Sequence, residues 1–247
     1  MTDPQSTAAR HLAQVEESTR HLLHTVAELA PESLAEPSAL PGWTRGHVLA
    51  HLARNADSLV NLLEGARTGT DIPQYASDEA REQGIERDAP RPLEVQLADL
   101  RDSHARFVAA AAQLGPESWA ATVRHRFGYT FPAFDIPAKR VVELEFHHVD
   151  LAAGYTPAHW PQEFAVARFR AIAAGLAGEA SLPAVELVSE DTADRAVIGA
   201  PAAAGAGPAL TVEGPVRALT AWLSGRSTGD GLRHAPGTAL PQLPPMG

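Results

Sequence analysis

A carboxylate and an imidazole stand one helical turn apart within residues 141–150. Glu143 and His147 are four residues apart, so on a helix both side chains project from the same face. Such a pair forms half of a site for a divalent metal ion. Pairs with this spacing also occur on exposed helices, where both side chains are simply solvated. Apolar neighbours such as Leu144 and Phe146 predict a largely buried helix, and a buried carboxylate needs a partner, which favours the metal site.

A second apolar helical segment carries the further imidazole that such a site requires. His47 and His51 are also four residues apart, and their spacing alone excludes neither from a shared site. His51 stands deeper in its helix, whereas His47 belongs to the first turn. His148 lies about 100° round the helix from His147 and is expected to face elsewhere. Two imidazoles and one carboxylate would leave a tetrahedral zinc ion with one open position, as in catalytic rather than structural sites.

Composition limits the chemistry and the partners. The sequence contains no cysteine, so neither a thiolate ligand nor a cysteine nucleophile is available, and thiol chemistry would need an external thiol. A formal net charge of −10 without a basic face argues against a nucleic-acid partner. The first residues lack an apolar signal core, and no apolar run approaches the roughly 20 residues that cross a bilayer. We therefore expect a cytoplasmic protein with no membrane partner.

Apolar residues at helical spacing predict four long helices in the first part of the chain. These helices are expected at residues 6–30, 45–66, 93–114 and 138–153. The polar connection over residues 68–92 is long enough to form a lid, with a short helix expected at residues 76–86. Long helices joined by one or two long crossings are typical of a four-helix bundle.

The pattern changes after Gly154. Short β-branched runs predict three strands between two further helices. The helices are expected at residues 161–177 and 215–225, and the strands at residues 184–188, 195–198 and 209–213. We therefore predict a mainly α protein, with a four-helix bundle and its metal site in residues 1–157 and a smaller α+β domain in residues 158–247.

Arg226 follows a glycine at the end of the last predicted helix. An arginine on such a turn is a good candidate for forked hydrogen bonds to a carboxylate. The same position fits equally well an arginine that complements the negative end of the helix dipole. The residue pattern leaves both interpretations open.

Residues 40–56, which read LPGWTRGHVLAHLARNA, resemble the N-terminal signature of the mycothiol-dependent maleylpyruvate isomerases, which belong to the DinB-like four-helix metalloenzymes. The similarity returns in four shorter stretches, residues 62–69, 75–81, 143–151 and 225–226. The resemblance implies a DinB-like bundle whose three zinc ligands are His51, Glu143 and His147. It also implies that Arg226 is a catalytic, substrate-binding residue.

The resemblance further implies zinc and mycothiol as cofactors for the conversion of maleylpyruvate to fumarylpyruvate in gentisate degradation. Addition of a thiolate to the carbon–carbon double bond would permit rotation, and elimination would restore the trans alkene. Zinc would lower the pKa of the thiol, and Arg226 would hold a substrate carboxylate or the developing enolate oxygen.

Two alternatives remain at this stage. The first is a related zinc- and mycothiol-dependent S-transferase that conjugates the thiol to another electrophile without returning it. The second is a non-catalytic DinB-like protein. The intact ligand set argues against the second alternative, and the similarity at residues 75–81 argues against the first.

Overall fold

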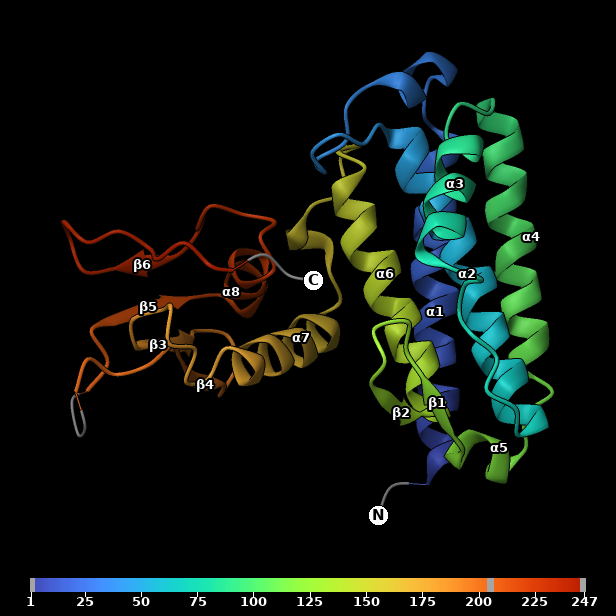
Figure 1. Cartoon of the computed structure of the whole chain (residues 1–247). Helices are drawn as coiled ribbons and strands as arrows, with labels where there is room; N and C mark the ends of the chain where they lie inside the picture. The colour runs from blue at the N-terminus through green and yellow to red at the C-terminus, as the bar shows by residue number, and fades with distance from the viewer. Residues whose placement is uncertain (1–2, 204–206, 245–247) are drawn as a thin grey trace. The chain divides into compact units, whose positions relative to one another are not determined.

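The computed structural model describes residues 3–203 and 207–244. The chain divides into two compact units, Met1–Tyr155 and Thr156–Gly247 (Figure 1). The first unit is helical and the second combines helices with a sheet, which confirms the fold class predicted from the sequence. Within the described residues, no helix has both the length and the apolar character that crossing a membrane requires.

Four long helices form the body of the first unit. They are α1 (Pro4–Ala27), α2 (Arg45–Thr68), α4 (Leu93–Ala111) and α6 (Ile136–Asp150). They lie side by side in Figure 1, and α1 and α2 each pack against both α4 and α6. The helices therefore follow the ring order α1, α4, α2, α6. The connections from α1 to α2 and from α4 to α6 must cross the diagonal of this ring, which explains why both are long.

Local sequence determines where these helices begin and end. Asp3 caps α1, since its carboxylate accepts a hydrogen bond from the backbone N–H of Ser6 at 2.8 Å. Thr44 and His47 form a capping box at the start of α2. Gly69 ends α2 with a φ of +69°, a left-handed conformation that glycine adopts without strain. The described α2 and α6 lie within a few residues of their predicted positions.

The two diagonal connections contain short elements of their own. The first holds the 3-10 helix η1 (Pro31–Ala35). The second holds α5 (Pro116–Ala120), the strands β1 (Thr122–Arg124) and β2 (Thr130–Pro132), and η2 (Ala133–Asp135). β1 and β2 pair in antiparallel register. This hairpin was not predicted from the sequence, because strands of three residues are too short to show a period of two.

The connection between α2 and α4 carries α3 (Asp78–Asp88), close to the predicted short helix. α3 packs against α2 and is tied down by Arg54 of that helix. The Arg54 guanidinium donates to Asp88 of α3 at 3.1 Å and forks onto both oxygens of Asp99 of α4 at 2.6 and 2.7 Å. Because the Asp88 side chain is 2 % exposed, this network holds α3 firmly on the bundle.

The second unit contains a four-stranded sheet in the order β4-β3-β5-β6. Its elements are η3 (Pro157–His159), α7 (Gln162–Gly175), β3 (Val185–Ser189), β4 (Arg195–Ile198), β5 (Leu210–Gly214), α8 (Val216–Leu223) and β6 (Arg233–His234). β3 runs parallel to β5 and antiparallel to β4. The core of this unit packs Phe169 of α7 and Leu219 of α8 against Val185 and Leu187 of β3.

Candidate metal centre

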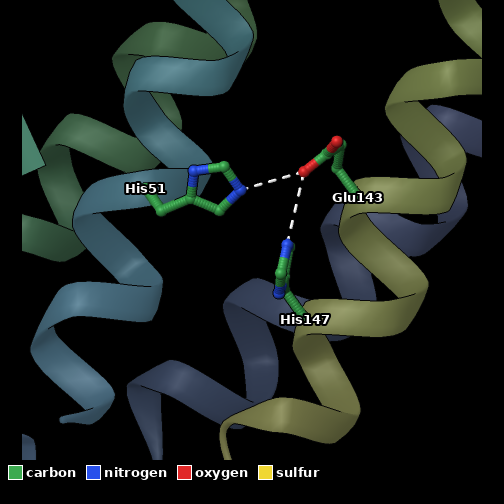
Figure 2. A group of neighbouring side chains, drawn as sticks. All are labelled: His51, Glu143 and His147. Atoms are coloured by element: carbon green, nitrogen blue, oxygen red, sulfur yellow. Dashed lines mark hydrogen bonds and ion pairs between the residues drawn. The ribbon is translucent and has the colours of Figure 1, made fainter. Parts of the chain in front are cut away.

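His51 of α2 and Glu143 and His147 of α6 each bring one donor atom to a common point (Figure 2). The Nε2 atom of His51 lies 2.9 Å from Oε2 of Glu143, and Nε2 of His147 lies 3.3 Å from the same oxygen. All three donor atoms lie within 4.8 Å of one another. Two ligands bound at about 2.1 Å to a tetrahedral zinc ion stand about 3.4 Å apart, so these separations fit a shared divalent ion.

The packing of α2 against α6 creates this convergence. His51 is 5 % exposed, and it stands among α2 residues such as Leu49 and Leu52 that are fully buried. The side chains of Glu143 and His147 are 32 % and 17 % exposed. The cluster is therefore enclosed on the α2 side. Solvent reaches it in part through Glu143 and His147. Glu143 and His147 are therefore not a simple solvated pair on an exposed helix.

The other two histidines of these segments lie outside the cluster. The Nδ1 atom of His47 accepts a hydrogen bond from the backbone N–H of Thr44 at 3.2 Å, and its Nε2 lies 3.3 Å from a carboxylate oxygen of Glu86. His148 faces α1, where its Nε2 lies 2.8 Å from the Thr25 hydroxyl. The structure thus brings His51, rather than His47, to the pair on α6.

The charge states of His51 and Glu143 favour binding of a cation. Burial lowers the pKa of His51 to about 4, so this imidazole is neutral at physiological pH. Burial opposes ionisation of Glu143, but hydrogen bonds from His147 and His51 hold the pKa of this carboxyl well below its usual value. Burial also opposes a charged His147, yet hydrogen bonds to Asp150 and Glu143 raise the pKa of its imidazole. A metal ion would therefore compete with the proton that these hydrogen bonds favour on His147.

Asp150 supports the site from behind, and its role was not predicted from the sequence. The Nδ1 atom of His147 lies 2.9 Å from Oδ2 of Asp150, whose side chain is 3 % exposed. This hydrogen bond fixes the ring and leaves Nε2 as the coordinating nitrogen, as outer carboxylates do at many histidine–metal sites. The available signal was the spacing of three residues from His147, which places both side chains on one helix face.

Aromatic and cationic side chains contact His51 or lie one turn from Glu143. The ring of Trp43 lies 5.5 Å from that of His51, measured between centroids. The Nη2 atom of Arg81 on α3 lies 3.4 Å from Nδ1 of His51. One turn before Glu143, the Lys139 ammonium donates to the Tyr129 hydroxyl at 3.1 Å, on the hairpin. None of these residues was assigned a role from the sequence, because the fold brings them together from separate segments.

Arg226 belongs to the second unit and stands three residues after Leu223, the last residue of α8. Gly225 adopts a φ of +72°, and the backbone N–H of Arg226 donates to the carbonyl of Ala221 at 2.8 Å. This Schellman turn requires glycine and fixes the position of the arginine. The Arg226 guanidinium donates to the carbonyl of Ser224 at 3.0 Å, in agreement with the helix-end interpretation. Its catalytic role stays a prediction.

The first unit thus defines a class: four-helix-bundle proteins that carry a cluster of two histidines and one glutamate. Residues 15–152 match the family model of the mycothiol maleylpyruvate isomerase N-terminal domain. Because this match covers more than half of the chain, the protein belongs to that family, which confirms the resemblance seen in the sequence.

Two solved structures are similar to the whole chain. One is described as the crystal structure of the mycothiol-dependent maleylpyruvate isomerase, and the other as that of a mutant of this enzyme with one histidine replaced by alanine. Each has 26 % sequence identity and a TM-score of 0.88, with 100 % of both chains covered. The similarity therefore extends through both units. No curated protein sequence matches the chain.

Proposed function

We propose that this protein is a zinc- and mycothiol-dependent isomerase that converts maleylpyruvate to fumarylpyruvate in gentisate degradation. The observation that carries the proposal is the convergence of His51, Glu143 and His147 in a chain of this family. The full-length similarity to a mycothiol-dependent maleylpyruvate isomerase supports it. The absence of cysteine from the sequence also supports it, since the nucleophilic thiol must then be external.

The residues of the cluster fit zinc. Zinc binds both imidazole nitrogens and carboxylate oxygens, and three protein ligands leave a fourth position for a thiol. Bound zinc would supply a Lewis acid that favours the thiolate form of mycothiol at neutral pH. Glu143 would neutralise part of the charge of the ion. Asp150 would hold His147 in the coordinating orientation through the hydrogen bond of 2.9 Å.

A direct assay tests this function. Purified, zinc-loaded protein is mixed with maleylpyruvate, with and without mycothiol, and the formation of fumarylpyruvate is followed. We expect turnover only with mycothiol, and the free thiol concentration should stay constant because elimination returns the thiol. An S-transferase would instead consume one thiol per product. No conversion of maleylpyruvate under either condition contradicts the proposed function.

A second prediction concerns Arg226, which we propose as a ligand of a substrate carboxylate or of the developing enolate oxygen. Arg226→Lys keeps the charge but loses the forked donors, so we expect kcat/KM to fall about 10-fold while zinc content stays unchanged. The control is Arg233→Lys, at an exposed arginine of the same unit. Wild-type kinetics in Arg226→Lys would show that the arginine only caps α8.

A further inference from the structure

Arg81 lies against the metal cluster without a carboxylate partner among the residues that the structure describes. Its contacts are with His51, at 3.4 Å from Nδ1, and with Tyr75, whose ring centroid is 6.0 Å from the guanidinium carbon. Arg87 on the same helix, by contrast, pairs with Asp88 at 2.8 Å. In a chain with a formal net charge of −10, a half-buried arginine without such a partner requires an explanation.

α3 holds Arg81 in this position. Arg81, Ile85 and Asp88 recur at helical spacing on one face of α3, and the last two are buried against the bundle. The first turn of α3 is tied by Arg126, which donates to Asp78 at 2.9 Å. The last turn is tied through Asp88 to Arg54, at 3.1 Å. Arg81 is therefore directed at the cluster by a helix that is anchored at both ends.

The hydrogen bond from Arg81 to His51 would be lost if a metal ion bound to His51. A guanidinium can only donate hydrogen bonds, so Arg81 needs Nδ1 of His51 as an acceptor. If Nε2 of His51 binds a metal ion, the neutral ring carries its hydrogen on Nδ1 and offers no acceptor there. The Tyr75 side chain accepts from one of the five guanidinium donors. The donor released by His51 would need another acceptor beside the cluster, and an anionic ligand supplies one.

We propose that Arg81 is a carboxylate anchor of the substrate site, binding one carboxylate of a dianionic substrate beside the metal centre. The identity of that substrate as maleylpyruvate, which carries two carboxylates, rests on the proposed function. A planar guanidinium matches a carboxylate through two parallel hydrogen bonds. Arg81 binds the substrate in its ground state, so its loss should weaken substrate binding more than it slows the chemical step.

Steady-state kinetics test the anchor. Arg81→Gln should raise the KM for maleylpyruvate at least about 10-fold with little change in kcat, and Arg81→Lys, which keeps the charge, should raise it less. The matched control is Arg101→Gln, which removes the same charge from an exposed site on α4 and should leave both constants unchanged. Zinc content and helical circular dichroism should be those of the wild type in all three variants. An unchanged KM, or a loss confined to kcat, overturns the proposal.

A binding measurement separates this proposal from the proposed function. Heptanedioate, a saturated dicarboxylate with the same number of carbons as maleylpyruvate, cannot react with a thiol. Titration calorimetry with zinc-loaded protein should show saturable binding to the wild type and to Arg101→Gln, and binding weakened at least about 10-fold in Arg81→Gln. If the wild type fails to isomerise maleylpyruvate but shows this pattern, the anion site stands and only the substrate is wrong. No saturable binding to the wild type, or equal binding to Arg81→Gln, overturns the anchor.

Discussion

Replacing His51 or His147 with alanine is expected to abolish both zinc binding and isomerase activity while the bundle stays folded. Each imidazole supplies one of three donor atoms that lie within 4.8 Å of one another. Loss of an outer-shell partner alone typically costs 10–100-fold in metal affinity, so loss of a ligand should cost more than about 100-fold. Zinc content after dialysis and turnover of maleylpyruvate with mycothiol measure the two effects.

The bundle should survive these substitutions because its core does not depend on a metal. Val48, Leu49 and Leu52 of α2 are fully buried, and they pack the helix whether or not an ion is present. His47→Ala is the matched control on the same helix: it removes an imidazole outside the cluster and should retain zinc and activity, at a cost of about 1 kcal/mol for the lost helix cap. Loss of helical circular dichroism in His51→Ala or His147→Ala would show that the metal is structural instead.

The helices of the bundle could be predicted because each carries a long apolar stripe. α4 begins at Leu93, as predicted, and ends at Ala111 rather than at residue 114. The β1–β2 hairpin could not be predicted, since its two three-residue strands are determined by pairing with each other and by contacts such as Arg126 N–H to Gln74 Oε1 at 2.8 Å. Such pairing depends on the tertiary fold and leaves no local period.

The cluster itself was partly accessible from the sequence. Glu143 and His147 share a helix, so their spacing alone places them on one face. The choice of His51 over His47 depended on depth within α2, and the structure explains it through the capping role of His47. Arg81 is thirty residues from His51 in the chain, yet its Nη2 lies 3.4 Å from Nδ1 of His51. Only the docking of α3 on α2 brings the two side chains together. No local sequence pattern predicts how α3 docks on α2.

Arg140 is buried, although arginine side chains are mostly exposed. It is 1 % exposed, and its Nη1 donates at 2.8 Å both to the carbonyl of Leu52 and to Oδ1 of Asn55. Burial lowers the pKa of Arg140 to about 10, so the guanidinium still carries its charge at neutral pH. It stands one turn before Glu143 on α6, and both of its acceptors belong to α2. Arg140 therefore clamps together the two helices that supply the metal ligands.

Arg140→Met is expected to lower the free energy of unfolding of the metal-free protein by about 3 kcal/mol. Methionine fills most of the space of the arginine stem, so the main loss is that of two charge-assisted hydrogen bonds, each contributing about 1.5–3 kcal/mol, less the desolvation cost that the charge no longer incurs. Urea unfolding followed by circular dichroism measures the change. The control is Arg101→Met on the exposed face of α4, which should stay within about 0.5 kcal/mol of the wild type. Equal stability of Arg140→Met and the wild type would mean that apolar packing alone holds α6 against α2, and that the metal ligands need no polar clamp to stay in register.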